Sequence, residues 1–408
     1  MPFDAEPSRV SQAVLPRSES IRKKRHRLRK TAGQILPRER VRNCGCHRHS
    51  DVVDIHRSDR GAHFVGVETC GSVWLCPVCS AKIAETRREE VAEAITGITG
   101  EGGSSYMLTL TMRHGLRDPL DFLKEQIVNG WRKVQNRRAY RAIKEEFGVV
   151  GTIRAIEVTH GKNGWHPHLH ILFLFEGPLF KKDEANVQNA LFTLWADVLD
   201  KAGGGYVSLD ALDFRPATAS DYVTKWGTDR ELVKGQEKLG NGSRSPWQLL
   251  DAFSCGDKQA GALFREYAET FKGTRQLTWS KGLKARYGIG ELDDLDAAKE
   301  ATEADEQLPL DDGLKEGRIG TLDRGTFDAV VRLGLTADLL DAAHSKGWRG
   351  VTTLLSKHKL ATYHDDSFAW KQPPKGGRPA HPKYYLNWNH KEFRESVETG
   401  AGRSRKTA

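Results

Sequence analysis

The chain has 408 residues, of which 38% are hydrophobic and 29% charged, and its formal net charge is +9. That length corresponds to two or three domains, and the longest apolar run, ILFLF at 171–175, is far shorter than the roughly 18–20 residues of a membrane span. The polar amino terminus lacks the apolar core of a signal peptide. We therefore exclude membrane and secreted proteins, expect a cytoplasmic one, and take the positive charge to indicate an anionic partner.

Composition divides the chain into segments of different character. Residues 1–43 contain 12 basic and four acidic residues with few large apolar ones, which predicts a disordered arm. Its cluster of Arg22, Lys23, Lys24 and Arg25 is a candidate for DNA phosphate contacts, although terminal charge runs are often only solvated tails. The expected segments are a basic arm at 1–43, a cysteine-rich module at 44–98, a central domain at 99–290, an acidic linker at 291–320, a small helical region at 321–365 and a basic tail at 366–408.

In the central domain, apolar residues alternate in some stretches and recur every three to four positions in others. Alternation is typical of strands and the longer period of helices. The glycine-containing segment HGKNGWHP separates two strand patterns and predicts a hairpin. The order of elements predicts an α+β fold, a central antiparallel sheet with helices packed on it. In chain order we expect a strand at 102–113, a helix at 118–147, strands at 151–159 and 168–175, a helix at 184–201, a strand at 205–209 and a helix at 217–226.

Five of the six cysteines lie between Cys44 and Cys79, a clustering that favours a metal site over a disulfide framework in a reducing compartment. Cys70, Cys76 and Cys79, with Cys44 upstream, offer four thiolates, and Zn²⁺ is the metal that prefers such a closed structural site. Rival ligands for the upstream position are Cys46, His47 and His49. Buried free cysteines are the alternative interpretation, and the isolated Cys255 is expected in the core.

His166, His168 and His170 alternate along one strand, so they would share one of its faces. If the hairpin loop is centred near 162.5, paired residue numbers sum to 325, and Glu157 lies opposite His168 on the same face. The same register keeps the apolar residues of both strands together on the opposite face. Imidazoles beside a carboxylate predict a shallow divalent metal site, and surface histidines of an ordinary strand are the alternative.

Two aromatic residues are further candidates. Tyr222 and Lys225 fall at i and i+3 of the helix expected at 217–226, so the cation could stabilise a phenolate or bind a phosphate. Taken alone, a structural tyrosine is the more common case. Trp165, next to the histidines, could stack on an unpaired base, although most tryptophans belong to cores.

Three motifs, in this order, resemble those of HUH endonucleases, and most closely those of rolling-circle replication initiators of small bacterial plasmids. They are MLTLT at 107–111, HPHLH at 166–170 and YVTK at 222–225. Supporting similarity lies in ETCGSVWLCPVCSAKI at 68–83, RAIEVTHGKNGWHPHLHILF at 154–173 and GTRQLTWSKGLKARYG at 273–288, with weaker similarity at 321–356, so that it covers most of residues 44–356.

The resemblance implies that His168, His170 and Glu157, with His166, hold Mg²⁺ or Mn²⁺ against the scissile phosphate of origin DNA, single-stranded or extruded. It further implies that Tyr222 attacks phosphorus to give a 5′-phosphotyrosine and a 3′-OH, that Lys225 assists, and that the strand is rejoined at termination. It favours Cys44 as the fourth zinc ligand. A host helicase and a DNA polymerase are the expected partners, and a homodimer stays open. Some relatives have a glutamate one turn before the tyrosine, where this chain has Thr218, which leaves the termination step open.

Three other functions are alternatives. A zinc-containing transposase of the two-tyrosine type would need a second tyrosine one turn on, where this chain has Trp226. A conjugative relaxase would usually place its tyrosine ahead of the histidines. A non-catalytic zinc DNA-binding protein would have no use for the aligned Glu157 and His168.

Overall fold

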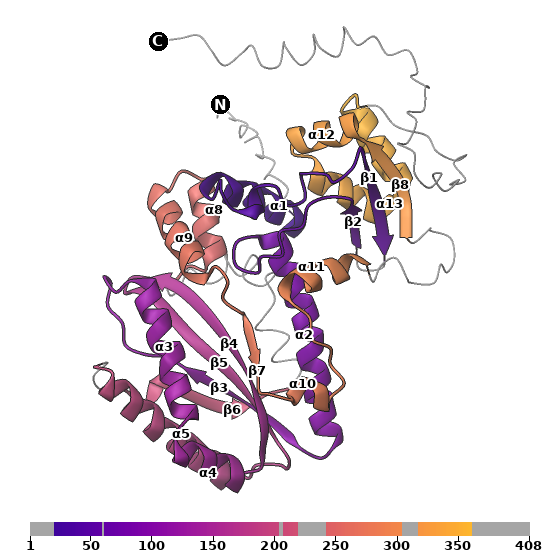
Figure 1. Cartoon of the computed structure of the whole chain (residues 1–408). Helices are drawn as coiled ribbons and strands as arrows, with labels where there is room; N and C mark the ends of the chain where they lie inside the picture. Colours follow the sequence, from indigo (N-terminus) through magenta and orange to yellow (C-terminus); the bar gives the residue numbers. More distant parts are fainter. Residues whose placement is uncertain (1–19, 59–60, 204–206, 219–241, 304–316, 361–408) are drawn as a thin grey trace, which may run out of the picture. The chain divides into compact units, whose positions relative to one another are not determined.

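The computed structural model describes residues 20–58, 61–203, 207–218, 242–303 and 317–360. Within these residues the protein has an α+β fold with two antiparallel sheets, one of five strands and one of three (Figure 1). None of the helices in the described ranges is long and apolar enough to span a membrane.

The larger sheet has the strand order β6-β3-β5-β4-β7, and every pair in it is antiparallel. The expected strands at 102–113, 151–159 and 168–175 are all present in it. The strand expected at 205–209 forms instead as β6, after a 3₁₀ turn at Leu209–Ala211. The strands are β3 (Ser104–Leu110), β4 (Val149–Gly161), β5 (Gly164–Phe175), β6 (Leu212–Pro216) and β7 (Leu277–Trp279).

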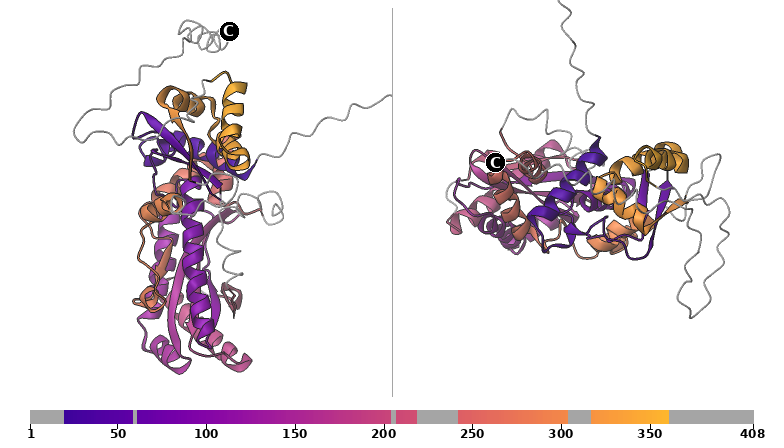
Figure 2. Two further views of the ribbon diagram at one scale, coloured as in Figure 1. Left: turned by 90° about the vertical axis from the view of Figure 1, so that its right-hand side faces the viewer. Right: turned by 90° about the horizontal axis from the view of Figure 1, so that it is seen from above.

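Helices cover both faces of this sheet (Figures 1 and 2). The face with Leu169, Ile171 and Phe173 packs against five helices, and these three side chains are fully buried. The helix expected at 118–147 is two of these, α3 and α4, because the chain leaves the helical path at Asn136 and Arg137. The five are α3 (Leu120–Gln135), α4 (Arg138–Glu146), α5 (Lys181–Lys201), α8 (Pro246–Ser254) and α9 (Lys258–Phe271).

The opposite face of the sheet is covered only over part of its length. Ile153 and Leu172 pack there against α2 (Pro77–Gly100) and the short α10 (Leu283–Arg286). Thr109 and His170 lie on this same face, at the end of the strands nearer the β4–β5 turn. This partly covered face is where the sequence places its polar candidates.

The smaller sheet joins two stretches that are far apart in the chain. β1 (Val52–Ser58) pairs with β2 (Gly61–Val65) on one side and with β8 (Gly317–Asp323) on the other. Helices α12 (Arg324–Leu333) and α13 (Thr336–Lys357) pack on this sheet and bury a core of its own. The cysteine-rich module and the helical region, expected as separate segments, therefore share one sheet.

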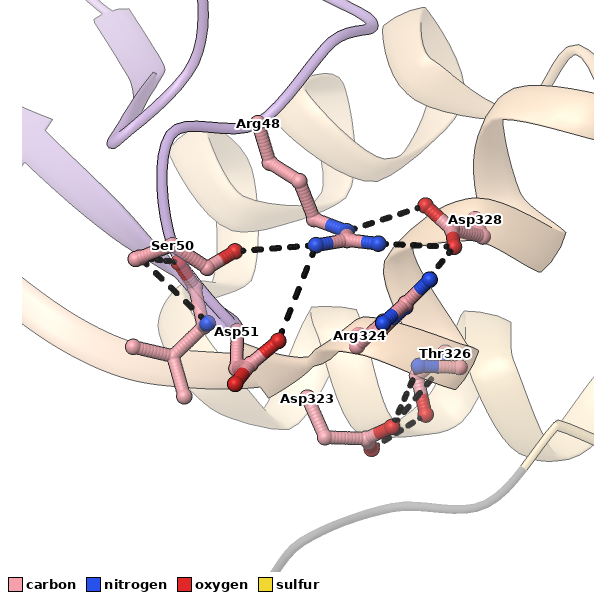
Figure 3. Close-up of polar contacts among 9 residues, drawn as sticks. Arg48, Ser50, Asp51, Asp323, Arg324, Thr326 and Asp328 are labelled. Atoms are coloured by element: carbon pink, nitrogen blue, oxygen red, sulfur yellow. Dashed lines mark hydrogen bonds and ion pairs between the residues drawn. The ribbon is translucent and has the colours of Figure 1, made fainter. Parts of the chain in front are cut away.

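An arginine adds a polar connection between these two stretches. The Arg48 guanidinium donates to both carboxylate oxygens of Asp328 on α12, at 3.2 and 3.3 Å (Figure 3). Its Nη1 also donates to the Ser50 carbonyl at 3.1 Å. A bidentate pair of this kind fixes direction as well as distance, so it orients the segment after the cysteines relative to α12.

Residues 21–35, expected to be disordered, form helix α1 (Ile21–Ile35). The Ser20 hydroxyl caps the helix by accepting from the Lys23 backbone N–H at 3.3 Å. Leu28 and Ala32, four positions apart, are completely buried. This short apolar stripe is enough to dock the helix, and its dense cations conceal it in the sequence; residues 1–19 lie outside the described part of the chain.

Part of the expected acidic linker is also packed. Residues 294–303 form α11 (Asp294–Glu303), and Ala297 and Ala298 are fully buried. Asp294 forms an ion pair of 3.1 Å with Arg87 of α2. The segment therefore begins as a helix docked on α2.

Candidate metal centres

The hairpin register expected from the sequence is confirmed. β4 and β5 are joined by a turn at residues 162 and 163, and Glu157 pairs with His168 and Ile156 with Leu169. Both strands are longer than expected, since β5 already begins at Gly164. The turn therefore has only two residues, and a turn of this length determines which residues of the two strands pair.

This register brings a carboxylate and two imidazoles together. Glu157 Oε2 lies 3.1 Å from His168 Nε2 and 3.0 Å from His170 Nε2. One ligand atom from each of the three residues lies within 4.8 Å of the other two. Burial opposes the charge on Glu157, but the neighbouring imidazoles outweigh it and hold the pKa of Glu157 well below its usual range. The group therefore presents an ionised carboxylate between two histidines.

The Nδ1 atoms of His168 and His170 have partners that orient the two rings. His168 Nδ1 lies 3.3 Å from the His166 carbonyl oxygen, which can only accept, so Nδ1 carries a proton and Nε2 is the nitrogen that faces Glu157. His170 Nδ1 lies 3.2 Å from the Thr109 hydroxyl. The Nε2 atoms of His168 and His170 thus both face Glu157 Oε2, so two nitrogens and one carboxylate oxygen converge on one point. A divalent cation that accepts mixed nitrogen and oxygen ligands fits this arrangement.

His166 is not part of this group. Its Nδ1 lies 2.8 Å from Nε2 of His114, in the loop after β3, and His114 Nδ1 lies 3.0 Å from the Asn163 carbonyl oxygen. Burial, reinforced by His168 and His114, lowers the pKa of His166 to about 4. His114 belongs to no recognisable motif, so sequence patterns contain no signal for it.

The four expected zinc ligands converge. The Sγ atoms of Cys44, Cys70, Cys76 and Cys79 all lie within 4.8 Å of one another, and all four residues are buried and free of disulfides. The Sγ–Sγ separations are 3.5 Å for Cys44–Cys79, 3.6 Å for Cys70–Cys79 and 3.8 Å for Cys44–Cys76. A tetrahedral Zn²⁺ with Zn–S bonds of about 2.3 Å would separate its sulfurs by about 3.8 Å. The cluster therefore has the dimensions of a structural zinc site.

The rival ligands point elsewhere. Cys46 Sγ lies 3.3 Å from the Arg42 carbonyl, and His47 is an exposed residue beside Glu68. Cys255, expected in the core, is exposed at the end of α8. Within the described residues, Cys44 is thus the upstream cysteine that joins the other three.

Two expected DNA contacts have other partners in the structure. Trp165 is only 3% exposed, and its indole N–H donates to Glu266 at 2.9 Å, so its face is closed to a base. Burial, reinforced by Arg22, lowers the pKa of Arg25 to about 10. The other three cations of the basic cluster form the ion pairs Arg22–Asp341 at 3.0 Å, Lys23–Asp338, and Lys24–Asp251 at 3.0 Å. These three ion pairs connect α1 to α13 and α8.

The expected nucleophile, Tyr222, and its neighbour Lys225 lie outside the described residues, as does Trp226. The described chain stops at Thr218, just after β6, and resumes at residue 242. β6 is the edge strand next to β3, on the side of the sheet away from β4.

The fold and its two candidate centres define an α+β protein with a Glu-His-His group on an antiparallel sheet and a four-cysteine group at the start of α2. A family model described as "Replication protein" matches residues 64–319, and the chain belongs to this family. The resemblance to plasmid rolling-circle Rep proteins is thereby confirmed. Membership makes the chain a plasmid replication initiator, for which an endonuclease activity on origin DNA is expected.

Three relatives illustrate the range of similarity. A Protein rep from Streptomyces lividans is 27% identical over 356 residues, covering 69% of this chain and 76% of the relative. A Neomycin resistance protein from Streptomyces cyanogenus is 28% identical over 188 residues, covering 38% of this chain and 43% of the relative. A Protein rep from Lentilactobacillus hilgardii is 24% identical over 209 residues, covering 50% of this chain and 64% of the relative. No solved structure matches the chain.

Proposed function

We propose that this protein starts rolling-circle replication by nicking one strand at a plasmid origin, with Tyr222 as the nucleophile, and rejoins the strand at termination. The products of nicking are a 5′-phosphotyrosine and a 3′-OH, from which a polymerase extends while a helicase opens the duplex. The observation that supports this most is the Glu157–His168–His170 group on the partly covered face of the sheet. Such a reaction belongs in the cytoplasm, where the plasmid is.

Each residue of the group has a distinct task in this proposal. Glu157, His168 and His170 would hold Mg²⁺ or Mn²⁺, and a metal ion bound there would polarise the scissile phosphate and stabilise its developing charge. The Thr109 hydroxyl orients the His170 ring, and the His166 carbonyl orients that of His168. Lys225 would neutralise the tyrosine oxygen or the phosphate. A mixed nitrogen and oxygen ligand set suits Mn²⁺ better than Mg²⁺, which prefers oxygen alone.

The cysteine group has a separate, structural task. With four buried thiolates and no open position, Zn²⁺ there would hold the turn before α2 to the segment after α1, without contacting substrate. Cys76 also caps α2, its sulfur accepting from the Cys79 backbone N–H at 3.5 Å. The site therefore fixes the start of the long helix that packs on the sheet.

The test incubates the protein with Mn²⁺ and single-stranded oligonucleotides that tile its own replicon, then resolves covalent adducts on denaturing gels. We expect an adduct with one oligonucleotide, lost in Tyr222→Phe and in His168→Ala. His160→Ala, on the same hairpin but outside the metal group, is the matched control and should keep it. An adduct that survives both Tyr222→Phe and His168→Ala would contradict the proposal, and the complete absence of adducts with origin oligonucleotides would favour a non-catalytic DNA-binding protein.

His114 provides a more graded prediction. The His114 ring contacts the His166 ring near the start of β5. The carbonyl oxygen of His166 in turn contacts the His168 ring and orients it. Removing a residue that orients a metal ligand typically lowers metal affinity about 10- to 100-fold. We therefore expect His114→Ala to weaken Mn²⁺ binding about 10-fold, measured by calorimetry. His114→Gln, whose amide can accept from His166, should restore part of it, whereas Arg117→Ala in the same loop should change nothing. Equal affinity in His114→Ala and wild type would show that the pair does not position the group.

A further inference from the structure

The module built from β1, β2, β8, α12 and α13 has no role in the function proposed so far. The family model ends at residue 319, so both of its helices lie beyond the matched region. Val53 and Ile55 of β1 pack against Phe327 and Leu339 of the two helices, and all four are fully buried. The module therefore has its own core, and its two helices lie outside the region that the family model matches.

Helix α13 consists of two halves that meet at Gly347. This glycine has φ 58° and ψ −151°, outside the helical region, where other residues are strained. A Cβ on Gly350 would lie 2.3 Å from the Ala342 carbonyl oxygen, so the second half packs closely against the first. The Trp348 ring lies against Gly320 of β8, where a Cβ would be 2.2 Å from it. The second half, residues 348–357, is thus held in one orientation.

The two halves of α13 carry charges of opposite sign. The first half carries Asp338 and Asp341, which form ion pairs with Lys23 and Arg22 of α1. From residue 342 to residue 359 the sequence contains no acidic residue. The cations there are Lys346, Arg349, Lys357 and Lys359, all exposed, and within the described residues none of them has an ion-pair partner.

The second half is amphipathic in a way that suits a nucleic acid. Val351 and Leu355 are fully buried in the module core. The opposite face exposes Arg349, Thr353, Ser356 and Lys357, side chains that contact phosphates and base edges in protein–DNA complexes. Ten residues of helix are about 15 Å long, and the major groove, about 12 Å wide, admits a helix.

We propose that the exposed face of residues 348–357 binds duplex DNA. The inference rests on the proposed function in one respect, since it assigns to this face the duplex beside the nick site while the Glu-His-His group acts on the single strand. Charge complementarity selects the partner. This face carries Arg349 and Lys357 and no acidic residue, whereas Arg22, Lys23 and Lys24 of α1 already form ion pairs with carboxylates of the same chain.

The experiment measures binding of full-length protein to a fluorescent origin duplex by anisotropy, without added divalent metal, over a range of salt concentrations. For Arg349→Ala/Lys357→Ala we expect a Kd raised at least about 10-fold and a salt slope reduced by about 2, one unit per lost phosphate contact. The matched control is Lys272→Ala/Arg286→Ala, which removes the same charge from exposed residues paired with Glu39 and Glu101 at 2.6 Å. It should bind duplex like wild type.

Unchanged duplex affinity and salt slope in Arg349→Ala/Lys357→Ala would overturn the proposal, and so would an equal loss in the control. A parallel loss of single-stranded adduct formation would also count against it, because the face is assigned to duplex alone. Arg349→Lys/Lys357→Arg should restore duplex affinity, which separates lost contacts from misfolding. Since the assay needs neither metal nor cleavage, Tyr222→Phe should bind duplex normally, and failure of the nicking proposal would leave this result intact.

Discussion

Cys76→Ser is expected to release zinc and to destabilise the protein more than any other single cysteine substitution. Cys76 is completely buried, its sulfur lies 3.8 Å from that of Cys44, and it caps α2. Losing one of four thiolates leaves three buried cysteines without a cation to hold them together. Structural zinc contributes about 10–16 kcal/mol in small zinc peptides. Even a fraction of that, at about 2–4 °C per kcal/mol for a domain of this size, lowers Tm by about 10 °C or more.

Zinc content by atomic absorption and Tm by calorimetry measure the two effects together. Cys46→Ser and Cys255→Ser are matched controls, because both side chains lie outside the cluster. They should retain one zinc per chain and shift stability by no more than about 0.5 kcal/mol. Wild-type protein without zinc, or Cys76→Ser with full zinc and unchanged Tm, would remove the structural role assigned to this group.

The sequence was sufficient for the parts of the site that local pattern determines. The two-residue turn and the alternation of apolar residues leave one register for the β4–β5 hairpin, because a slip by one residue would bury Glu157 and expose the apolar face. Cys70, Cys76 and Cys79 are close in the chain, so their convergence could also be predicted. These predictions needed contacts over short sequence distances only.

The features that the sequence did not predict correctly depend on contacts between segments that are far apart in the chain. The pairing of β1 with β8 joins residues more than 250 positions apart, and nothing in either strand specifies the other. His114 reaches His166 only because the loop after β3 lies beside the hairpin, where a Cβ on Gly164 would be 3.0 Å from the Gly115 carbonyl oxygen. Trp165 could have stacked on a base, but it is buried and its indole N–H donates to Glu266 of α9. Such contacts are set by packing, which periodicity does not encode.

Contacts between distant segments also explain why α1 is a helix although its composition predicted disorder. Its cations satisfied the compositional rule for disorder, yet acids from α8 and α13 neutralise them pairwise. A cluster of cations therefore indicates an anionic partner without identifying it, and here carboxylates of the same chain take that place. The charge left unpaired on α13 is the better guide to where DNA could bind.

Glu157→Gln is expected to cause the largest loss of activity that leaves the fold intact. Glutamine keeps the shape of the side chain but removes the charge that both imidazoles face, at 3.1 Å from His168 and 3.0 Å from His170. A neutral amide is a poor ligand for Mn²⁺ or Mg²⁺ compared with a carboxylate. We expect Mn²⁺ affinity to fall about 100-fold or more, measured by calorimetry. We expect adduct formation to fall about 1,000-fold, since electrostatic stabilisation by a bound metal would account for several kcal/mol of the barrier.

The matched control is Glu176→Gln, at the exposed end of the same hairpin, which should bind Mn²⁺ and form adducts like wild type. His170→Ala should resemble Glu157→Gln in both measurements, because the two side chains share one centre. Raising Mn²⁺ to saturating concentration distinguishes weak binding from lost chemistry: recovery of adducts in Glu157→Gln assigns the carboxylate to holding the metal, whereas persistent loss assigns it a further part in the reaction. If Glu157→Gln keeps wild-type Mn²⁺ affinity, the aligned glutamate is not a ligand, and the centre must be sought among the histidines alone.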